Sequence, residues 1–363
     1  MNFIGLAEAG YLPDWLIRMG IRRLLASRLQ ERRRGASQLM AEFVQLLKRS
    51  AVALATEQAN AQHYEVPAAF FETVLGPRLK YSCCFYPDKS TRLAERADRE
   101  DGDRSLAQAE DAMLDLTCQR AEISDGMQIL DLGCGWGSLS FWIAEHYPGC
   151  RITAVSNSRT QKQFIESRCR ERGTRNIEVV TANVADYLAT ADYDRIVSVE
   201  MFEHMRNYET LLERVGGWLR PNGKLFVHIF CHRTYAYPFE IDGDGDWMAR
   251  HFFTGGIMPS FDLLNQFDRD VKVSQSWFID GRHYAQTCER WLKNLDAHRT
   301  KLGDLFARAI GVKEAPVVLQ RWRIFFMACA ELFAFGGGQE WGVGHYLLEP
   351  ARRFADAELI GSF

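Results

Sequence analysis

The sequence predicts an α/β fold in which a parallel sheet carries helices on both faces. Two observations predict it. Beyond residue 105, short apolar runs alternate with segments of helical spacing, which is typical of consecutive strand–helix–strand units. In addition, the apolar run 129–132 leads directly into the glycine-rich turn 133–137, which the apolar helical segment 139–144 follows. A buried strand that ends in such a turn is typical of the ligand-binding edge of an open sheet.

The N-terminal part of the chain is predicted to be helical. Residues 14–34 show amphipathic spacing and carry seven arginines, and a second helical pattern covers 37–58. Pro67 then interrupts the helical pattern. We therefore expect a helical extension over 1–63 and a second domain over 64–363. The arginines are compatible with peripheral contact to a membrane or an anionic partner, but a helix packed on the core with solvent-facing arginines is favoured.

The alternating region contains a regular series of candidate elements. A helix is expected over 105–121, after a charged loop over 92–104. Candidate strands follow at 127–132, 151–155, 177–181, 195–199, 224–230, 271–279 and 343–348. A Pro-Asn-Gly turn at 221–223 precedes the fifth of them. Two segments break the alternation: 231–266, which we interpret as a cap insertion over the carboxyl edge of the sheet, and 285–335, which is largely helical.

Composition and charge exclude several function classes. The formal net charge of -3 gives no general attraction for phosphate backbones, so no nucleic-acid partner is expected. No apolar run is long enough to cross a bilayer, and the first residues lack the pattern of a secretory signal, so we expect a cytoplasmic location. The nine cysteines form no CxxC pair, and no His/Cys cluster has zinc spacing, so neither a disulfide framework nor a metal site is predicted.

The glycine turn predicts a site for a nucleotide-type cofactor. Gly133 and Gly135 lack a Cβ and therefore let the backbone approach a ligand closely. The G-x-G-x-G spacing departs from the G-x-G-x-x-G pattern of dinucleotide sites, and no acidic residue ends the second strand. That strand leads instead into Ser156, Asn157 and Gln161, whose polar groups can bind ribose hydroxyls or the methionine end of a cofactor. S-adenosyl-L-methionine is therefore favoured over a nicotinamide cofactor, and a helix cap in the same segment is compatible with this role.

The fourth strand leads into a cluster of ionisable residues, Glu200, Glu203 and His204. If the chain turns helically from Phe202, Glu200 and His204 are a turn apart and face one another. An imidazole beside two carboxylates can take a proton from a substrate amine while the carboxylates stabilise the resulting charge. The alternative is a helix start whose acidic residues oppose the positive end of the helix dipole. We favour the catalytic interpretation because the cluster follows a strand at the ligand-binding edge.

Several linked motifs carry a resemblance to a known family. They include, in this order, YEVPAAFFETVLGPRLKYSCCFY, ILDLGCGWGSLS, SNSRTQKQFIE, YDRIVSVEMFEHM and GRHYAQTCERWL. The chain resembles the coclaurine N-methyltransferase-like family of S-adenosylmethionine-dependent methyltransferases, which is related to the cyclopropane fatty-acyl-phospholipid synthases. The likeness covers residues 64–348. It implies a Rossmann-like, seven-stranded class I methyltransferase sheet with a helical N-terminal extension and helical cap insertions.

The resemblance also implies roles for individual residues. The cofactor-binding positions are matched by Tyr81, Ser82, Gly133, Gly135, Ser156, Asn157, Gln161, Asn183 and Val184. The catalytic positions are matched by Glu200, Glu203 and His204, and the substrate-binding positions by His228, Tyr284, Phe335 and Trp341. The N-methyltransferases have aspartate where Asn183 stands, but an amide oxygen can still accept a hydrogen bond from an adenine amino group.

Glu200 separates the two branches of this resemblance. The cyclopropane synthases resemble the chain in the following Phe-Glu-His but have glycine in place of Glu200, whereas the N-methyltransferases have glutamate. We therefore expect the methyl acceptor to be the amine of an aromatic-bearing small molecule.

Two other hypotheses stay open. One is methyl or methylene transfer to an unsaturated fatty-acyl lipid, because Cys83, Glu203, His228 and Tyr284 match the bicarbonate site of the cyclopropane synthases in outline. The other is a cofactor-binding protein without turnover, which the intact ionisable cluster disfavours. The oligomeric state is not predicted, and a homodimer is one option.

Overall fold

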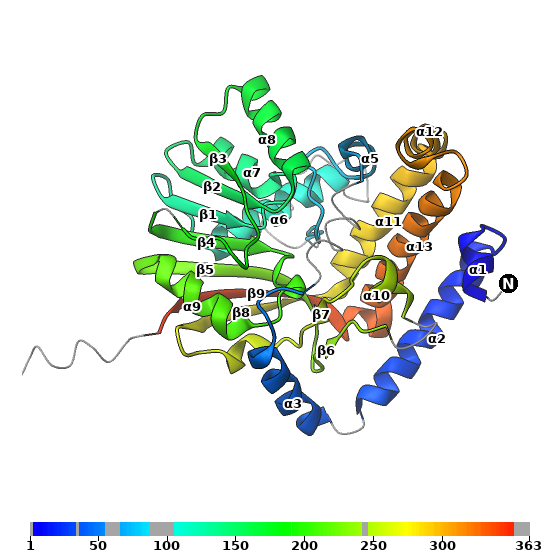
Figure 1. Cartoon of the computed structure of the whole chain (residues 1–363), viewed down its shortest axis with the longest axis horizontal. Coiled ribbons are helices and arrows are strands. Elements are labelled where there is room, and N and C mark those ends of the chain that lie inside the picture. Colours follow the sequence, from blue (N-terminus) through cyan, green and yellow to red (C-terminus); the bar gives the residue numbers. More distant parts are fainter. Residues whose placement is uncertain are drawn as a thin grey trace, which may run out of the picture.

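The computed structural model describes residues 3–33, 36–54, 66–87, 105–189, 191–241 and 246–351 (Figure 1). At its centre lies a seven-stranded sheet with the strand order β3-β2-β1-β4-β5-β9-β8. The first five strands along the chain are parallel, and β9 runs antiparallel to both β5 and β8. The strands are β1 (Gln128–Leu132), β2 (Arg151–Ser156), β3 (Ile177–Thr181), β4 (Tyr193–Val199), β5 (Leu219–His232), β8 (Val271–Ile279) and β9 (Trp341–Pro350). The predicted α/β fold and its seven strands are confirmed, but the sheet is not wholly parallel as expected, because β9 is antiparallel to both of its neighbours.

Helices cover both faces of this sheet (Figure 1). The helices are α1 (Phe3–Glu8), α2 (Asp14–Arg33), α3 (Ala36–Arg49), α5 (Ala68–Val74), α6 (Leu106–Arg120), α7 (Ser138–His146), α8 (Arg159–Arg172), α9 (Tyr208–Trp218), α10 (Trp247–His251), α11 (Gly281–Ala297), α12 (Arg299–Ile310) and α13 (Ala315–Ala334). Successive side chains of a strand point to opposite faces. Accordingly, Ile129 of β1 packs with side chains of α6 and α7, whereas Leu130 and Leu132 pack with those of α3 and α9. Because helices bury both faces of the sheet, a ligand can reach it only at the ends of the strands.

The N-terminal helix α2 packs against α13. Its arginines take part in this contact: Arg18 and Arg22 both form ion pairs with Glu331 of α13, at 3.1 and 2.5 Å. The Arg18 side chain is only 21% exposed, so it does not face solvent as expected, whereas the Arg22 side chain is 62% exposed and does. The second predicted helix, over 37–58, ends earlier than expected, because α3 stops at Arg49.

Two other expectations need correction. The turn expected at 221–223 lies inside β5, where Tyr193 of β4 pairs with Leu219 but Arg195 pairs with Lys224. Residues 220–223 therefore bulge out of an otherwise continuous strand. The cap insertion expected over 231–266 begins later, because β5 runs to His232.

The cap is only partly helical. It consists of the short antiparallel pair β6 (Tyr237–Pro238) and β7 (Ile257–Met258), the helix α10 and a single 3-10 turn. The helical region expected over 285–335 is formed by α11, α12 and α13. Among the described helices, none is long and apolar enough to cross a membrane. The charged loop expected over 92–104 lies outside the described residues.

Candidate active site

The glycine turn lies at the carboxyl ends of the parallel strands. Gly133, Gly135 and Gly137 have φ angles of +88°, +53° and +81°, a left-handed conformation that glycine adopts without steric cost. The Val155 carbonyl of β2 accepts hydrogen bonds from the backbone N–H groups of Gly133 and Cys134, at 3.0 and 2.9 Å. A Cβ at Gly135 would meet no protein atom within 4 Å, because this residue faces a cavity. The turn is therefore a rigid cradle with room for a ligand.

A small cavity, which we call the β2-side cavity, opens on one side of the turn. Ser156, Asn157, Gln161, Asn183 and Val184 line it, together with Gly133 and Gly135. The Ser156 hydroxyl donates to the Gln161 side-chain oxygen at 2.6 Å, and the Asn183 side-chain oxygen accepts from the backbone N–H of Ala185 at 3.0 Å. The predicted cap is also present, because the Ser158 hydroxyl accepts from the backbone N–H of Gln161 at the start of α8. The structure thus brings these predicted cofactor positions together.

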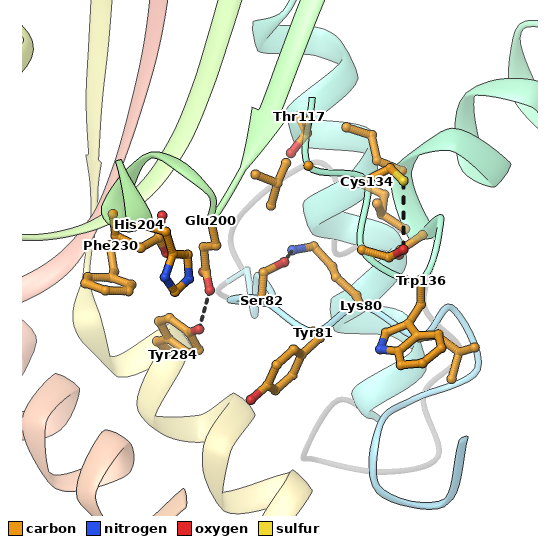
Figure 2. Close-up of a pocket in the computed structure, with 18 of the residues that line it drawn as sticks. Lys80, Tyr81, Ser82, Thr117, Cys134, Trp136, Glu200, His204, Phe230 and Tyr284 are labelled. Carbon is orange, nitrogen blue, oxygen red and sulfur yellow. Dashed lines mark hydrogen bonds between the residues drawn. The ribbon is translucent and has the colours of Figure 1, made fainter. Parts of the chain in front are cut away.

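A second cavity, the central cavity, opens on the other side of the turn and is shown in Figure 2. The predicted residues that line it are Tyr81, Ser82, Gly133, Gly135, Gln161, Glu200, Glu203, His204 and Tyr284. The two cavities are adjacent, and both are lined by Gly133, Gly135, Gln161, Glu200 and His204. In Figure 2, Glu200, His204 and Tyr284 face Tyr81 and Trp136 across the cavity.

A buried segment before α6 presents Tyr81 and Ser82 to the central cavity. Lys80, whose side chain is buried, donates to the Ser82 hydroxyl and, at 2.8 Å, to the Cys83 carbonyl. Glu110 of α6 holds the segment in place by accepting from the backbone N–H of Lys80 at 3.2 Å. Lys80 adds a positive charge to the cavity wall, which suits the carboxylate of a methionine-type cofactor.

Glu200 is the best-anchored ionisable group in the cavity. Its carboxylate accepts hydrogen bonds from the Cys83 backbone N–H at 3.0 Å, from the Tyr284 hydroxyl at 2.5 Å and from His228 Nε2 at 3.2 Å. Its backbone has a φ of +47°, which is strained for a residue with a Cβ. Burial raises the pKa of Glu200 to about 7, against the opposing effects of the Lys80 charge and of hydrogen bonds from Tyr284 and Cys83. Glu200 therefore changes its charge near neutral pH.

Glu203 and His204 lie in the 3-10 turn that follows β4. Burial, and then the neighbouring charge of Glu200, raise the pKa of Glu203 well above its usual range. Its Oε2 atom is buried without a hydrogen-bond partner among the described residues. The His204 ring stacks on Phe253, with centroids 5.8 Å apart. Of the two carboxyl groups, Glu200 is thus the one that becomes ionised around neutral pH, and His204 is the nearby imidazole.

A large apolar cavity, with a volume of about 680 Å³, lies beyond the ionisable cluster. It is enclosed by α1, α2, α13 and the cap, and it shares Phe230, Phe253, Tyr284, Phe325 and Cys329 with the central cavity. Phe253 also packs on Phe239 of the cap, with centroids 5.3 Å apart. The wall next to Glu200 and His204 is therefore aromatic.

Three predicted substrate residues do not line any of these cavities. Phe335 and Trp341 contact each other edge-on at 5.6 Å, and the Trp341 indole donates to the Tyr237 hydroxyl at 3.2 Å. His228 is fully buried behind Glu200. Conversely, sequence reasoning assigned no role to Trp136, Phe230 and Phe253, which do line the central cavity. An aromatic residue gives no local signal that separates a cavity wall from the core.

Comparisons with known proteins agree with this geometry. A family model described as mycolic acid cyclopropane synthetase matches residues 53–340. An (S)-coclaurine N-methyltransferase from Thalictrum flavum subsp. glaucum is 38% identical over 94% of this chain and 93% of its own. A crystal structure of coclaurine N-methyltransferase bound to N-methylheliamine and SAH superposes with a TM-score of 0.88 at 37% identity, covering 95% of this chain and 98% of that one. A cyclopropane-fatty-acyl-phospholipid synthase from Escherichia coli (strain K12) is 27% identical over 78% of this chain and 66% of its own.

Proposed function

The chain belongs to the mycolic acid cyclopropane synthetase family, and within that family we propose that it methylates the amine nitrogen of an aromatic-bearing small molecule. It is an S-adenosylmethionine-dependent methyltransferase, as its sequence predicts. The family contains both N-methyltransferases and lipid-modifying synthases. Family membership therefore does not identify the methyl acceptor, which has to be inferred from the residues of the site.

The surroundings of Glu200 carry the proposal. In the resemblance to the cyclopropane synthases, Cys83, His228 and Tyr284 match positions of a bicarbonate site. Here the Cys83 backbone, the His228 ring and the Tyr284 hydroxyl all contact the carboxylate of Glu200 instead. Because these donors are already occupied by the Glu200 carboxylate, they are not available to bind a bicarbonate ion. The carboxylate also places a negative charge where a cationic amine would enter.

The large cavity supports an aromatic-bearing acceptor. Its volume of about 680 Å³ is in the range of small-molecule sites. Aromatic faces such as those of Phe230 and Phe253 attract a cationic amine and stack on aromatic rings. The large cavity adjoins the central cavity at Tyr284 and Phe253, and the glycine turn lines the central cavity, so an amine at this junction would lie beside the cofactor site.

The ionisable cluster supplies the proton chemistry. S-adenosyl-L-methionine supplies an electrophilic methyl group when it is bound, and the Gly133–Gly137 turn with Ser156, Gln161 and Lys80 fits its polar parts. An amine can accept a methyl group only through a free lone pair, so its ammonium form must lose a proton. His204 takes that proton at a ring nitrogen, and the Glu200 charge stabilises the cation on either side of the transfer. A binding site that holds the amine nitrogen in line with the methyl carbon also accelerates the transfer, because the reacting atoms no longer have to find this orientation by diffusion.

A screen with methyl-labelled S-adenosyl-L-methionine tests the proposal. Purified protein is offered a panel of primary and secondary aromatic-bearing amines, and in parallel an extract of unsaturated phospholipids. We expect labelled amine products and no labelled lipid. Labelled lipid without labelled amine would establish the fatty-acyl alternative, for which the large apolar cavity also has room.

Several α2 arginines form ion pairs with other parts of the protein. Arg18 and Arg22 pair with Glu331, and Arg28 pairs with Asp246 of the cap at 3.1 Å. Their charges are therefore used to hold α2 on the protein.

The pH dependence of cation binding provides a second test. Because the pKa of Glu200 is raised to about 7, its charge is present above that pH and is lost as the pH falls through it. A quaternary ammonium with an aromatic group keeps its charge at every pH and isolates this effect. We expect its binding, measured by calorimetry between pH 5.5 and 8.5, to weaken below pH 7 by up to about tenfold per pH unit. A neutral isostere is the control, and equal affinity of the ammonium at pH 5.5 and 8.5 would contradict the charge assignment.

A further inference from the structure

A chain of three hydrogen bonds leads away from Glu200 into the protein. Glu200 Oε1 lies 3.2 Å from His228 Nε2, and His228 Nδ1 lies 2.8 Å from His345 Nε2. His345 Nδ1 in turn lies 2.9 Å from an Nη atom of Arg120. The two histidines are direct partners across the antiparallel β5–β9 pair, and both are fully buried. The chain thus runs from the active site to the last residue of α6.

Arginine fixes the direction of every bond in this chain. A guanidinium has only donors, so His345 Nδ1 must be the acceptor and must carry a lone pair. A neutral His345 then holds its proton on Nε2 and donates to His228 Nδ1. For the same reason His228 holds its proton on Nε2 and donates to the Glu200 carboxylate. One terminal donor therefore sets both tautomers.

We propose that Arg120, His345 and His228 are positioning residues that keep a hydrogen-bond donor aimed at Glu200, and that the chain does not conduct protons. This inference rests on the proposed function, because it concerns the group that faces the substrate amine. The Arg120 end has no acceptor, so a proton that reached Glu200 could not leave through it. The arrangement stabilises the ionised carboxylate and fixes its orientation.

The charges around the chain keep both imidazoles neutral. Burial, followed by the charges of Lys80 and Arg120, lowers the pKa of His228 well below its usual range. Burial, followed by His228, Arg120 and Lys80, does the same to the pKa of His345. Burial lowers the pKa of Arg120 to about 10, so it stays charged at neutral pH, and its guanidinium lies 4.8 Å from the centre of the Trp277 ring. The other ionisable groups around Glu200 include Lys80, Cys83, Cys84, Glu203, His204, Tyr284 and Cys288.

The tautomers are measurable without any substrate. In protein labelled with ¹⁵N-histidine, two-bond proton–nitrogen spectra distinguish the Nε2–H tautomer, the Nδ1–H tautomer and the imidazolium. We expect His228 and His345, assigned by loss of their signals in His228→Gln and His345→Gln, to be neutral Nε2–H tautomers from pH 6 to 8. In Arg120→Met at least one of the two should leave that state. An imidazolium or an Nδ1–H tautomer for either residue in the unmodified protein would overturn the inference.

Kinetics of a matched pair of variants test the positioning role. The amide of His345→Gln can donate to His228 and accept from Arg120, whereas the side chain of His345→Leu can do neither. We expect His345→Leu to lower kcat by about 10–100-fold with little change in the KM of the amine, and His345→Gln to recover most of that loss. Thermal unfolding of both variants separates this effect from a loss of folded protein. Equal kcat values in the two folded variants would overturn the inference.

Failure of the inference and failure of the proposed function give different results. If no amine is methylated but the tautomers are as expected, the hydrogen-bond chain stands and the assignment of the acceptor is wrong. If amines are methylated but the two His345 variants behave alike, the acceptor stands and the positioning role is wrong.

Discussion

Replacing Glu200 by glutamine is expected to lower kcat for amine methylation by about 10²–10³-fold while leaving the protein folded. The amide keeps the shape of the side chain. Its oxygen can accept from the Cys83 N–H and from His228, and its NH₂ group can donate to the Tyr284 hydroxyl, which then acts as the acceptor. The substitution therefore removes the charge and little else. Steady-state kinetics and the affinity for S-adenosyl-L-methionine separate loss of catalysis from loss of cofactor binding.

Tyr284→Phe is the matched comparison for this variant. It removes one donor but leaves the Glu200 charge in place, so we expect a smaller loss of kcat, about tenfold or less. Because the Tyr284 hydrogen bond lowers the pKa of Glu200, its removal should raise that pKa further and shift the acid side of the pH profile to higher pH. A Glu200→Gln protein that keeps kcat within about threefold would show that the carboxylate has no part in the chemistry.

The second large effect is expected at the glycine turn. Gly133→Ala places a Cβ 2.7 Å from the Met201 side chain at a φ of +88°. Both features are unfavourable, and together we expect them to reduce the free energy of unfolding by about 2–4 kcal/mol. Met201 adjoins Glu200, so any shift that relieves the contact also displaces the ionisable cluster. Urea denaturation measures the loss, and binding of S-adenosylhomocysteine should be lost with it.

Gly135→Ala and Gly303→Ala provide the matched controls. At Gly135 the new Cβ meets no protein atom but points into the cradle at a φ of +53°. We expect Gly135→Ala to lower the free energy of unfolding by about 1–2 kcal/mol and also to weaken cofactor binding. Because this variant stays folded, its loss of cofactor affinity can be measured directly, whereas in Gly133→Ala the same loss could result from unfolding. Gly303 lies inside α12 with nothing within 4 Å of its Cβ position, so Gly303→Ala should be neutral or stabilising by up to about 1 kcal/mol. If Gly133→Ala is as stable as Gly303→Ala, the turn is not the constrained cradle described above.

The sequence predicts the sheet well because the signal for each strand is local. Buried parallel strands are short apolar runs, and all seven candidate strands appear within a few residues of their expected bounds. The errors lie where tertiary contacts override local preference. The Pro-Asn-Gly segment 221–223 reads as a turn but bulges within β5, because the strand continues its pairing with β4 on both sides. Arg18 of α2 was expected to face solvent, but Glu289 and Glu331, both far along the chain, form ion pairs with it.

The predicted site shows the same division. The residues that follow β1, β2 and β4 could be grouped from the sequence, because the carboxyl ends of parallel strands meet at one edge. The sequence could not predict which carboxyl group of the cluster ionises first. Burial and the charge of Glu200 raise the pKa of Glu203 well above its usual range, whereas Glu200 ionises near pH 7, and these effects depend on the depth of each side chain.

The sequence by itself determined the sheet, the cofactor cradle and the identity of the ionisable cluster. All three follow from local patterns of apolar, glycine and polar residues. Only the tertiary structure decided what holds Glu200. The Cys83 N–H, the Tyr284 hydroxyl and the hydrogen-bond chain of His228, His345 and Arg120 come from five separate parts of the sequence. They meet because β9 returns antiparallel beside β5 and places His345 opposite His228, a register that no local pattern in either strand specifies.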